Sequence, residues 1–87
     1  MAVTVAQAAD ELLNISGVEA SFVLAKSGGR VLISGRSLDN INVQVILEKL
    51  GGGGHMTIAG AQLTDTTVDE VTKLLKTAID EYIQNAK

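Results

Sequence analysis

The order of apolar patterns along the chain predicts an α+β fold, an α/β sandwich in which helices pack on a small mixed β-sheet in the order α-β-β-α-β-α. Helical spacing of apolar residues marks both ends of the sequence. Between them, two segments with alternating apolar residues are joined by a glycine-containing turn. The 87 residues are enough for one hydrophobic core. We therefore expect a single domain, residues 1–87.

The first helix is expected at residues 4–14. Thr4 followed three positions later by Gln7 is typical of a capping box, in which each side chain accepts a hydrogen bond from the other residue's backbone. The apolar residues that follow recur with helical spacing and share one face: Val5, Ala8, Ala9, Leu12 and Leu13.

A β-hairpin is expected next, at residues 19–37. In its first strand, Ala20, Phe22 and Leu24 alternate with smaller residues, which indicates one apolar face. Ser27-Gly28-Gly29 provides a tight reversal. The second strand, residues 30–37, places its most apolar residues on one face and its polar residues on the other: Val31 and Ile33 against Arg30, Ser34 and Arg36.

The second half of the chain predicts helix, strand and helix. Asn42 is a suitable N-cap for a short helix up to Leu50, whose Val43, Ile46 and Leu47 lie on the same face. Residues 57–63 mix small and apolar residues around Gly60, which predicts a third strand or an irregular edge segment. Thr67 and Glu70 then form a capping box before the last helix, whose apolar face comprises Val68, Val71, Leu75, Ala78, Ile79 and Tyr82.

Composition argues against several classes of partner. With a net charge of -3 and only seven Lys and Arg, the chain lacks the basic field that duplex DNA requires. The absence of cysteine excludes disulfides and thiolate chemistry, and one Phe, one Tyr and no Trp make an aromatic platform for single strands unexpected. Apolar runs are short and the N-terminus does not resemble a signal peptide, so we expect no direct membrane contact and a cytoplasmic domain.

The run Gly51-Gly52-Gly53-Gly54-His55 holds four consecutive glycines and the only histidine. A glycine after the last apolar residue of a helix is typical of a C-terminal cap, which is the structural interpretation. The functional interpretation is an anion site, because glycines let backbone N–H groups approach a phosphate and a histidine can donate beside them. The run is not a Walker A loop, since no lysine follows it and it comes after a helix.

Other candidate residues also have two interpretations. Arg36 is either an exposed charge at a strand end or a bidentate donor to a phosphate. Asn42 is either a helix cap or a contact to a base or ribose. A single histidine without a second donor at ligand spacing predicts neither a metal site nor a catalytic residue in this chain. Ser34 or Ser37 could pair with His55 as a nucleophile, but no G-x-S-x-G motif supports such a pair.

Five segments of the sequence resemble the DHH-associated domain, type 1. They are AADELL at residues 8–13, ISGRS at 33–37, INVQVI at 41–46, GGGGH at 51–55 and AG at 59–60. The resemblance extends over nearly the whole chain and is strongest to the C-terminal domain of bacterial membrane-bound cyclic-di-AMP phosphodiesterases. The glycine-histidine motif is similar across the wider DHH family, whereas the run at 41–46 favours the cyclic-dinucleotide branch.

The resemblance implies that this chain binds substrate while chemistry takes place on another domain. In such proteins a separate DHH domain holds two manganese ions, and the associated domain faces it across a cleft. By resemblance, the substrate-binding residues are Arg36, Ser37, Asn42, Gly52, Gly53, Gly54 and His55. The D-H-H motif and the manganese ligands are missing from these 87 residues. We therefore expect a manganese-dependent hydrolase as the parent protein, anchored in the bacterial cell membrane, and little activity from this fragment.

Three functions remain open at the level of sequence. The first is the substrate-binding domain of an enzyme that hydrolyses cyclic-di-AMP to linear pApA. The second is the corresponding domain of an oligoribonuclease, whose substrate would be a short oligoribonucleotide, or of a phosphatase that acts on phosphoadenosine phosphate. The third is a non-catalytic interaction domain in which the glycine run is only a helix cap. Under the first two, the expected partners are the nucleotide and the DHH domain of the same chain.

Overall fold

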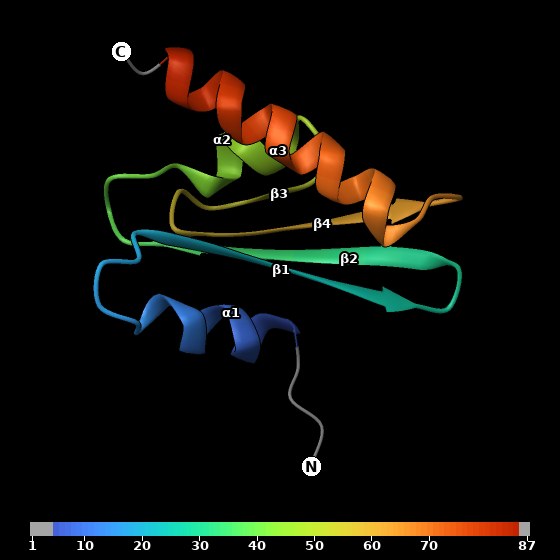
Figure 1. Cartoon of the computed structure of the whole chain (residues 1–87), viewed down its shortest axis with the longest axis horizontal. Helices are drawn as coiled ribbons and strands as arrows, with labels where there is room; N and C mark the ends of the chain where they lie inside the picture. The colour runs from blue at the N-terminus through green and yellow to red at the C-terminus, as the bar shows by residue number, and fades with distance from the viewer. Residues whose placement is uncertain (1–4, 86–87) are drawn as a thin grey trace.

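The computed structural model describes residues 5–85, which form three helices and four strands. The α+β class and the order of the predicted elements are confirmed (Figure 1). One element was not predicted, a two-residue strand within the glycine run. In chain order the elements are α1 (Val5–Leu13), β1 (Ala20–Ser27), β2 (Arg30–Ser37), α2 (Val43–Glu48), β3 (Gly53–Gly54), β4 (Ile58–Thr64) and α3 (Val68–Asn85).

The four strands form one sheet in the order β1-β2-β4-β3, with every pairing antiparallel. The prediction of a mixed sheet is therefore wrong. That prediction rested on the order of the elements alone. In the structure, β3 runs parallel to β2 one place further out, and the turn after β3 returns β4 into the vacant place between them. The unpredicted strand β3 thus explains the antiparallel sheet.

The helices lie on opposite faces of the sheet. In Figure 1, α1 lies below the sheet, while α2 and α3 lie above it. Helix α1 contacts β1 and β2, whereas α2 contacts β4, β2 and β3. On the α1 side of the sheet, the part formed by β4 and β3 is therefore not covered by a helix of the described chain.

The core lies between the sheet and the α2–α3 layer. Its largest fully buried side chains are Ile46, Leu47, Val31, Val43 and Val71. Phe22 and Leu24 of β1 pack against this cluster, as the alternation in the first strand predicts. The apolar faces predicted for α2 and α3 are also confirmed, because their members belong to the cluster or pack on it. Burial of these side chains is the main source of stability.

The face predicted for the first helix is only partly correct. Ala9 is fully buried, and its carbonyl accepts a 2.7 Å hydrogen bond from the Ser21 hydroxyl of β1. This close contact places the sheet next to the small residue, so Leu12 on the flank of the helix stays 42% exposed. The predicted cap residue Thr4 lies outside the described residues.

Caps fix the ends of α2 and the start of α3. Asn42 Oδ1 accepts from the Val45 backbone N–H at 3.1 Å, which confirms the predicted N-cap of α2. At the start of α3, the Thr67 hydroxyl accepts from the Glu70 backbone N–H at 3.1 Å, one half of the predicted capping box. The Glu70 carboxylate accepts from the Thr66 hydroxyl instead of reaching back to Thr67.

Candidate glycine-rich nucleotide site

The first two glycines of the run end the helical turn that follows α2. Gly51 has φ of +83°, and its N–H donates to Glu48 O at 3.1 Å. The N–H of Gly52 donates to Leu47 O at 2.9 Å. This pair of hydrogen bonds around a left-handed residue is a Schellman motif, so the predicted role of Gly51 as a helix cap is confirmed.

Gly52 and Gly54 are required by the close approach of the run to β4. A Cβ atom on Gly52 would lie 2.2 Å from Gly60 O, and one on Gly54 would lie 2.5 Å from Ile58 O. Gly54 also has φ of +145°, which side chains rarely adopt. Three of the four glycines therefore have a reason within the fold itself.

Gly53 is the exception. It pairs with Gly60 across β3 and β4, it has no left-handed φ, and a Cβ atom built on it would meet nothing within 4 Å. The described chain would accommodate a side chain here. If glycine is required at position 53, the reason is a molecule outside the described chain that contacts the backbone there.

Among residues 5–85, the strand register leaves the backbone N–H of Gly54 without a partner. His55 N donates to Ile58 O at 2.6 Å, which makes residues 55 and 58 a hydrogen-bonded pair. Because bonded and non-bonded pairs alternate along antiparallel strands, Gly54 and Ala59 form a non-bonded pair. Strand β3 is at the edge of the described sheet, so this alternation directs the Gly54 N–H away from β4.

A shallow hollow of about 500 Å³ lies beside the run. Its floor includes Ser34, Gly60 and Gly53, which are adjacent in register across β2, β4 and β3 and form a strip almost without side chains. Leu32 and Gln62, which also face each other across β2 and β4, line one side of the hollow. The hollow therefore offers a flat backbone surface together with the Ser34 hydroxyl and the Gln62 side-chain amide.

Arg36 and His55 lie in one row across the sheet. Arg36 pairs with Ile58 from the β2 side, and His55 is bonded to Ile58 from the β3 side. Typical Cα separations of about 4.5 Å for the non-bonded pair and about 5.5 Å for the bonded pair place their Cα atoms roughly 10 Å apart. The register thus brings together two predicted site residues that are 19 positions apart in sequence. The His55 side chain is exposed.

Arg36 is held in place by the first helix. Its Nε donates to Asp10 Oδ1 of α1 at 2.9 Å, and its Nη1 donates to Gly35 O at 2.9 Å. The side chain of Arg36 is 13% exposed, whereas that of Asp10 is 62% exposed. Arg36 is therefore neither a free surface charge nor fully available to a ligand.

Ser37 and Asn42 have structural roles in the same region. The buried Ser37 hydroxyl donates to Ile41 O at 2.6 Å and lies 3.4 Å from Met56 O, so it ties the connection before α2 to the turn after β3. The Asn42 side chain caps α2, and its backbone N–H donates to the Tyr82 hydroxyl at 3.0 Å. These contacts occupy the Ser37 hydroxyl and the Asn42 side-chain oxygen, so both groups have structural roles before any ligand binds.

Two residues beside the hollow, Ser34 and Gln62, were not predicted as binding residues. Ser34 was considered only as a nucleophile, and Gln62 was not considered. Gln62 Oε1 accepts from Arg30 Nη1 at 3.3 Å. The alternation of the hairpin placed Ser34 on the polar face, but the register of β4 against β2 could not be read from the sequence. Without that register, Gln62 could not be placed beside Leu32.

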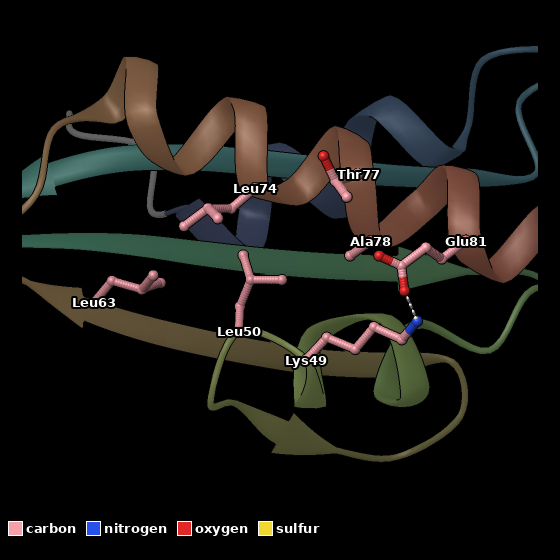
Figure 2. Close-up of a pocket in the computed structure, with 7 residues that line it drawn as sticks. All are labelled: Lys49, Leu50, Leu63, Leu74, Thr77, Ala78 and Glu81. Atoms are coloured by element: carbon pink, nitrogen blue, oxygen red, sulfur yellow. Dashed lines mark hydrogen bonds and ion pairs between the residues drawn. The ribbon is translucent and has the colours of Figure 1, made fainter.

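A second hollow of about 380 Å³ lies between α3 and the end of α2, on the opposite side of the sheet from α1 (Figure 2). Leu50, Leu63 and Leu74 line it, and Lys49 Nζ pairs with Glu81 Oε2 at 2.8 Å at its margin. It contains none of the predicted site residues. Most of its lining is apolar, so this hollow is less suited to a phosphate than the glycine strip.

The described residues do not fit a metal centre. Among residues 5–85, no group of three or more His, Cys, Asp or Glu side chains lies close enough to hold a metal ion. Within the same part of the chain, no helix is both long and apolar enough to cross a membrane.

Comparison with known proteins finds relatives along nearly the whole chain. The cyclic-di-AMP phosphodiesterase GdpP of Geobacillus thermodenitrificans is 57% identical over 86 residues, which is 98% of this chain and 13% of that protein. The cyclic-di-AMP phosphodiesterase PdeA of Listeria monocytogenes is 54% identical over 81 residues, 92% of this chain and 12% of that protein. The bifunctional oligoribonuclease and PAP phosphatase NrnA of Thermus thermophilus is 35% identical over 72 residues, 83% of this chain and 22% of that protein.

This chain therefore spans only 12–13% of the length of the two phosphodiesterases. The family model described as the DHHA1 domain matches residues 2–85. That match includes the glycine run, the row that contains Arg36 and His55, and every helix and strand described above. The chain belongs to the DHHA1 domain family.

Proposed function

We propose that this chain is the substrate-binding domain of a phosphodiesterase that hydrolyses cyclic-di-AMP to linear pApA. In this proposal the backbone at Gly52, Gly53 and Gly54, with His55 and Arg36, receives a phosphate and its nucleoside. Relatives more than 50% identical over nearly the whole chain are cyclic-di-AMP phosphodiesterases by name, which supports this substrate. The longer protein would be anchored in the cell membrane, with this domain on the cytoplasmic side.

The observation that carries the proposal is the open position at Gly53 beside the free N–H of Gly54. A glycine that the fold does not need, next to an unused donor and a flat strip, is the arrangement in which a ligand can rest on the backbone. Arg36 adds a cation in the neighbouring row that contains His55, two residues along β2 from the Ser34–Gly60–Gly53 strip. Neutralisation and positioning of the phosphodiester would be the contribution of this chain to the reaction.

The chemical step would take place on a DHH domain that these 87 residues do not contain. Two manganese ions bound there would activate water and polarise the phosphodiester. The residues described here do not supply a metal site, so none of them is assigned a role in holding those ions. The 87-residue chain with manganese alone should therefore hydrolyse cyclic-di-AMP weakly or not at all, and robust turnover by it would contradict the proposed division of labour.

The binding site can be tested by nuclear magnetic resonance titration of the 87-residue chain with cyclic-di-AMP. The proposal predicts shifts of the amide signals of Gly53, Gly54 and His55. The glycines of the β1–β2 turn, Gly28 and Gly29, provide an internal control at the other end of β2. Equal shifts at both glycine pairs, or none at either with millimolar ligand, would contradict the site.

The relationship to NrnA keeps a second substrate in the test, since that relative is an oligoribonuclease and PAP phosphatase by name. The same titration with linear pApA and with phosphoadenosine phosphate separates the two. Tighter binding of cyclic-di-AMP supports the first function, and preference for either linear nucleotide supports the second. A chain that binds none of the three would instead be an interaction domain.

A further inference from the structure

The guanidinium of Arg36 is anchored on one side only. Nε donates to Asp10 and Nη1 donates to Gly35 O, both at 2.9 Å. Among residues 5–85, Nη2 has no hydrogen-bond partner. In the same part of the chain, every buried side-chain nitrogen or oxygen of a non-exposed residue has a partner. The Nη2 group of this largely buried side chain therefore retains some exposure to solvent.

We infer that Asp10 of α1 is a positioning residue for the phosphate-binding arginine of the glycine site. The inference rests on the proposed function, because it takes Arg36 as a ligand to phosphate. The carboxylate fixes the guanidinium through Nε, and the Gly35 carbonyl fixes it through Nη1. The planar fork is thereby held rigid, and Nη2 is left to donate to an anion.

This arrangement gives Asp10 two opposing effects on an anionic ligand. As a negative charge, it repels the phosphate and partly neutralises Arg36. As an anchor, it removes the rotamer freedom that Arg36 would otherwise lose on binding. If charge dominated, removing the carboxylate would strengthen phosphate binding. If positioning dominates, as we infer, the same change weakens it.

The test compares Asp10→Asn with Glu11→Gln in the 87-residue chain. Both variants remove one negative charge from exposed positions of the same helix, but Glu11 has no side-chain hydrogen bond or ion pair in the described structure. Titration with cyclic-di-AMP should show Asp10→Asn binding about two- to fivefold more weakly than the unmodified chain. Glu11→Gln should bind equally well or slightly more tightly.

Two further readouts distinguish positioning from a general loss of structure. Affinity for adenosine, which lacks phosphate, should be the same in Asp10→Asn and in the unmodified chain. The Nε–H resonance of Arg36 should become exchange-broadened in Asp10→Asn and stay sharp in Glu11→Gln. Unchanged or tighter cyclic-di-AMP binding by Asp10→Asn would overturn the inference.

Failure of the underlying function gives a different result. Arg36→Ala should weaken cyclic-di-AMP binding by about tenfold or more. If Arg36→Ala binds as the unmodified chain does, the phosphate role of Arg36 is wrong, whatever Asp10→Asn does. If Arg36→Ala weakens binding and Asp10→Asn does not, the function stands and only the positioning role of Asp10 fails.

Discussion

The two faces of the sheet differ in what their residues do. On the face toward α2 and α3, large apolar side chains are buried to within a few per cent of complete exclusion from solvent. On the face toward α1, only β1 and β2 are in close contact with the helix, and the β4–β3 part carries the Gly60–Gly53 strip beside an open hollow. Side chains packed on the α2–α3 face therefore stabilise the fold, whereas the α1 face leaves part of the sheet backbone accessible.

The same contrast occurs within the glycine run itself. Gly52 and Gly54 allow the run to approach β4, so they serve the fold. Gly53 faces open space and has no such role. Substitutions can therefore separate stability from binding, both between the faces and between neighbouring glycines.

The largest loss of stability is expected on the α2–α3 face. Ile46→Ala should lower the free energy of unfolding by about 2–5 kcal/mol, because Ile46 is 1% exposed and its removal leaves a cavity in the core. Denaturant unfolding measures the loss. Leu74→Ala is the control, since Leu74 is 52% exposed and should change stability by only about 0.5 kcal/mol. An effect of Ile46→Ala as small as that expected for Leu74→Ala would show that this face is not the main source of stability.

A smaller loss is expected in the glycine run. Gly52→Ala should lower the free energy of unfolding by about 1–3 kcal/mol, because the new Cβ would lie 2.2 Å from Gly60 O and neither backbone can move without disturbing β4. Thermal unfolding measures the effect. A Gly52→Ala chain as stable as the unmodified one would mean that the run is not held against β4 as described.

The smallest effect is expected at the margin of the second hollow. The Lys49–Glu81 pair is partly exposed, so its coupling energy in a double-mutant cycle should be about 0.2–1 kcal/mol. The cycle uses Lys49→Met, Glu81→Gln and the double variant, and the coupling should fall further in high salt. A coupling above about 2 kcal/mol would indicate that this region contributes more to stability than the exposed fractions imply.

The sequence predicted most of the fold through periodicity and local capping. Alternation placed Val31 and Ile33 in the core, and Asn42 capped α2 as its position suggested. Strand β3 could not be predicted, because two glycines carry no side-chain pattern. The antiparallel return of β4 depends on β3, which is why the mixed sheet was wrong.

The candidate site was predicted in composition but not in geometry. The glycine run and Arg36 were identified, yet only the pairing of β2 with β4 shows that Arg36 and His55 share a row. The partner of Arg36 is Asp10, 26 positions away on another element, and no local pattern connects them. Tertiary contacts of this kind also distinguish Gly53 from its neighbours, which look identical in sequence.

The role of Gly53 in ligand binding can be tested by comparing Gly53→Ala with Gly29→Ala. At both positions a new Cβ would meet nothing within 4 Å, and neither glycine has a left-handed φ. Each variant should therefore keep a free energy of unfolding within about 1 kcal/mol of the unmodified chain. Gly53→Ala should bind cyclic-di-AMP at least several-fold more weakly than the unmodified chain, whereas Gly29→Ala should bind normally. Normal binding by a stably folded Gly53→Ala chain would contradict this role.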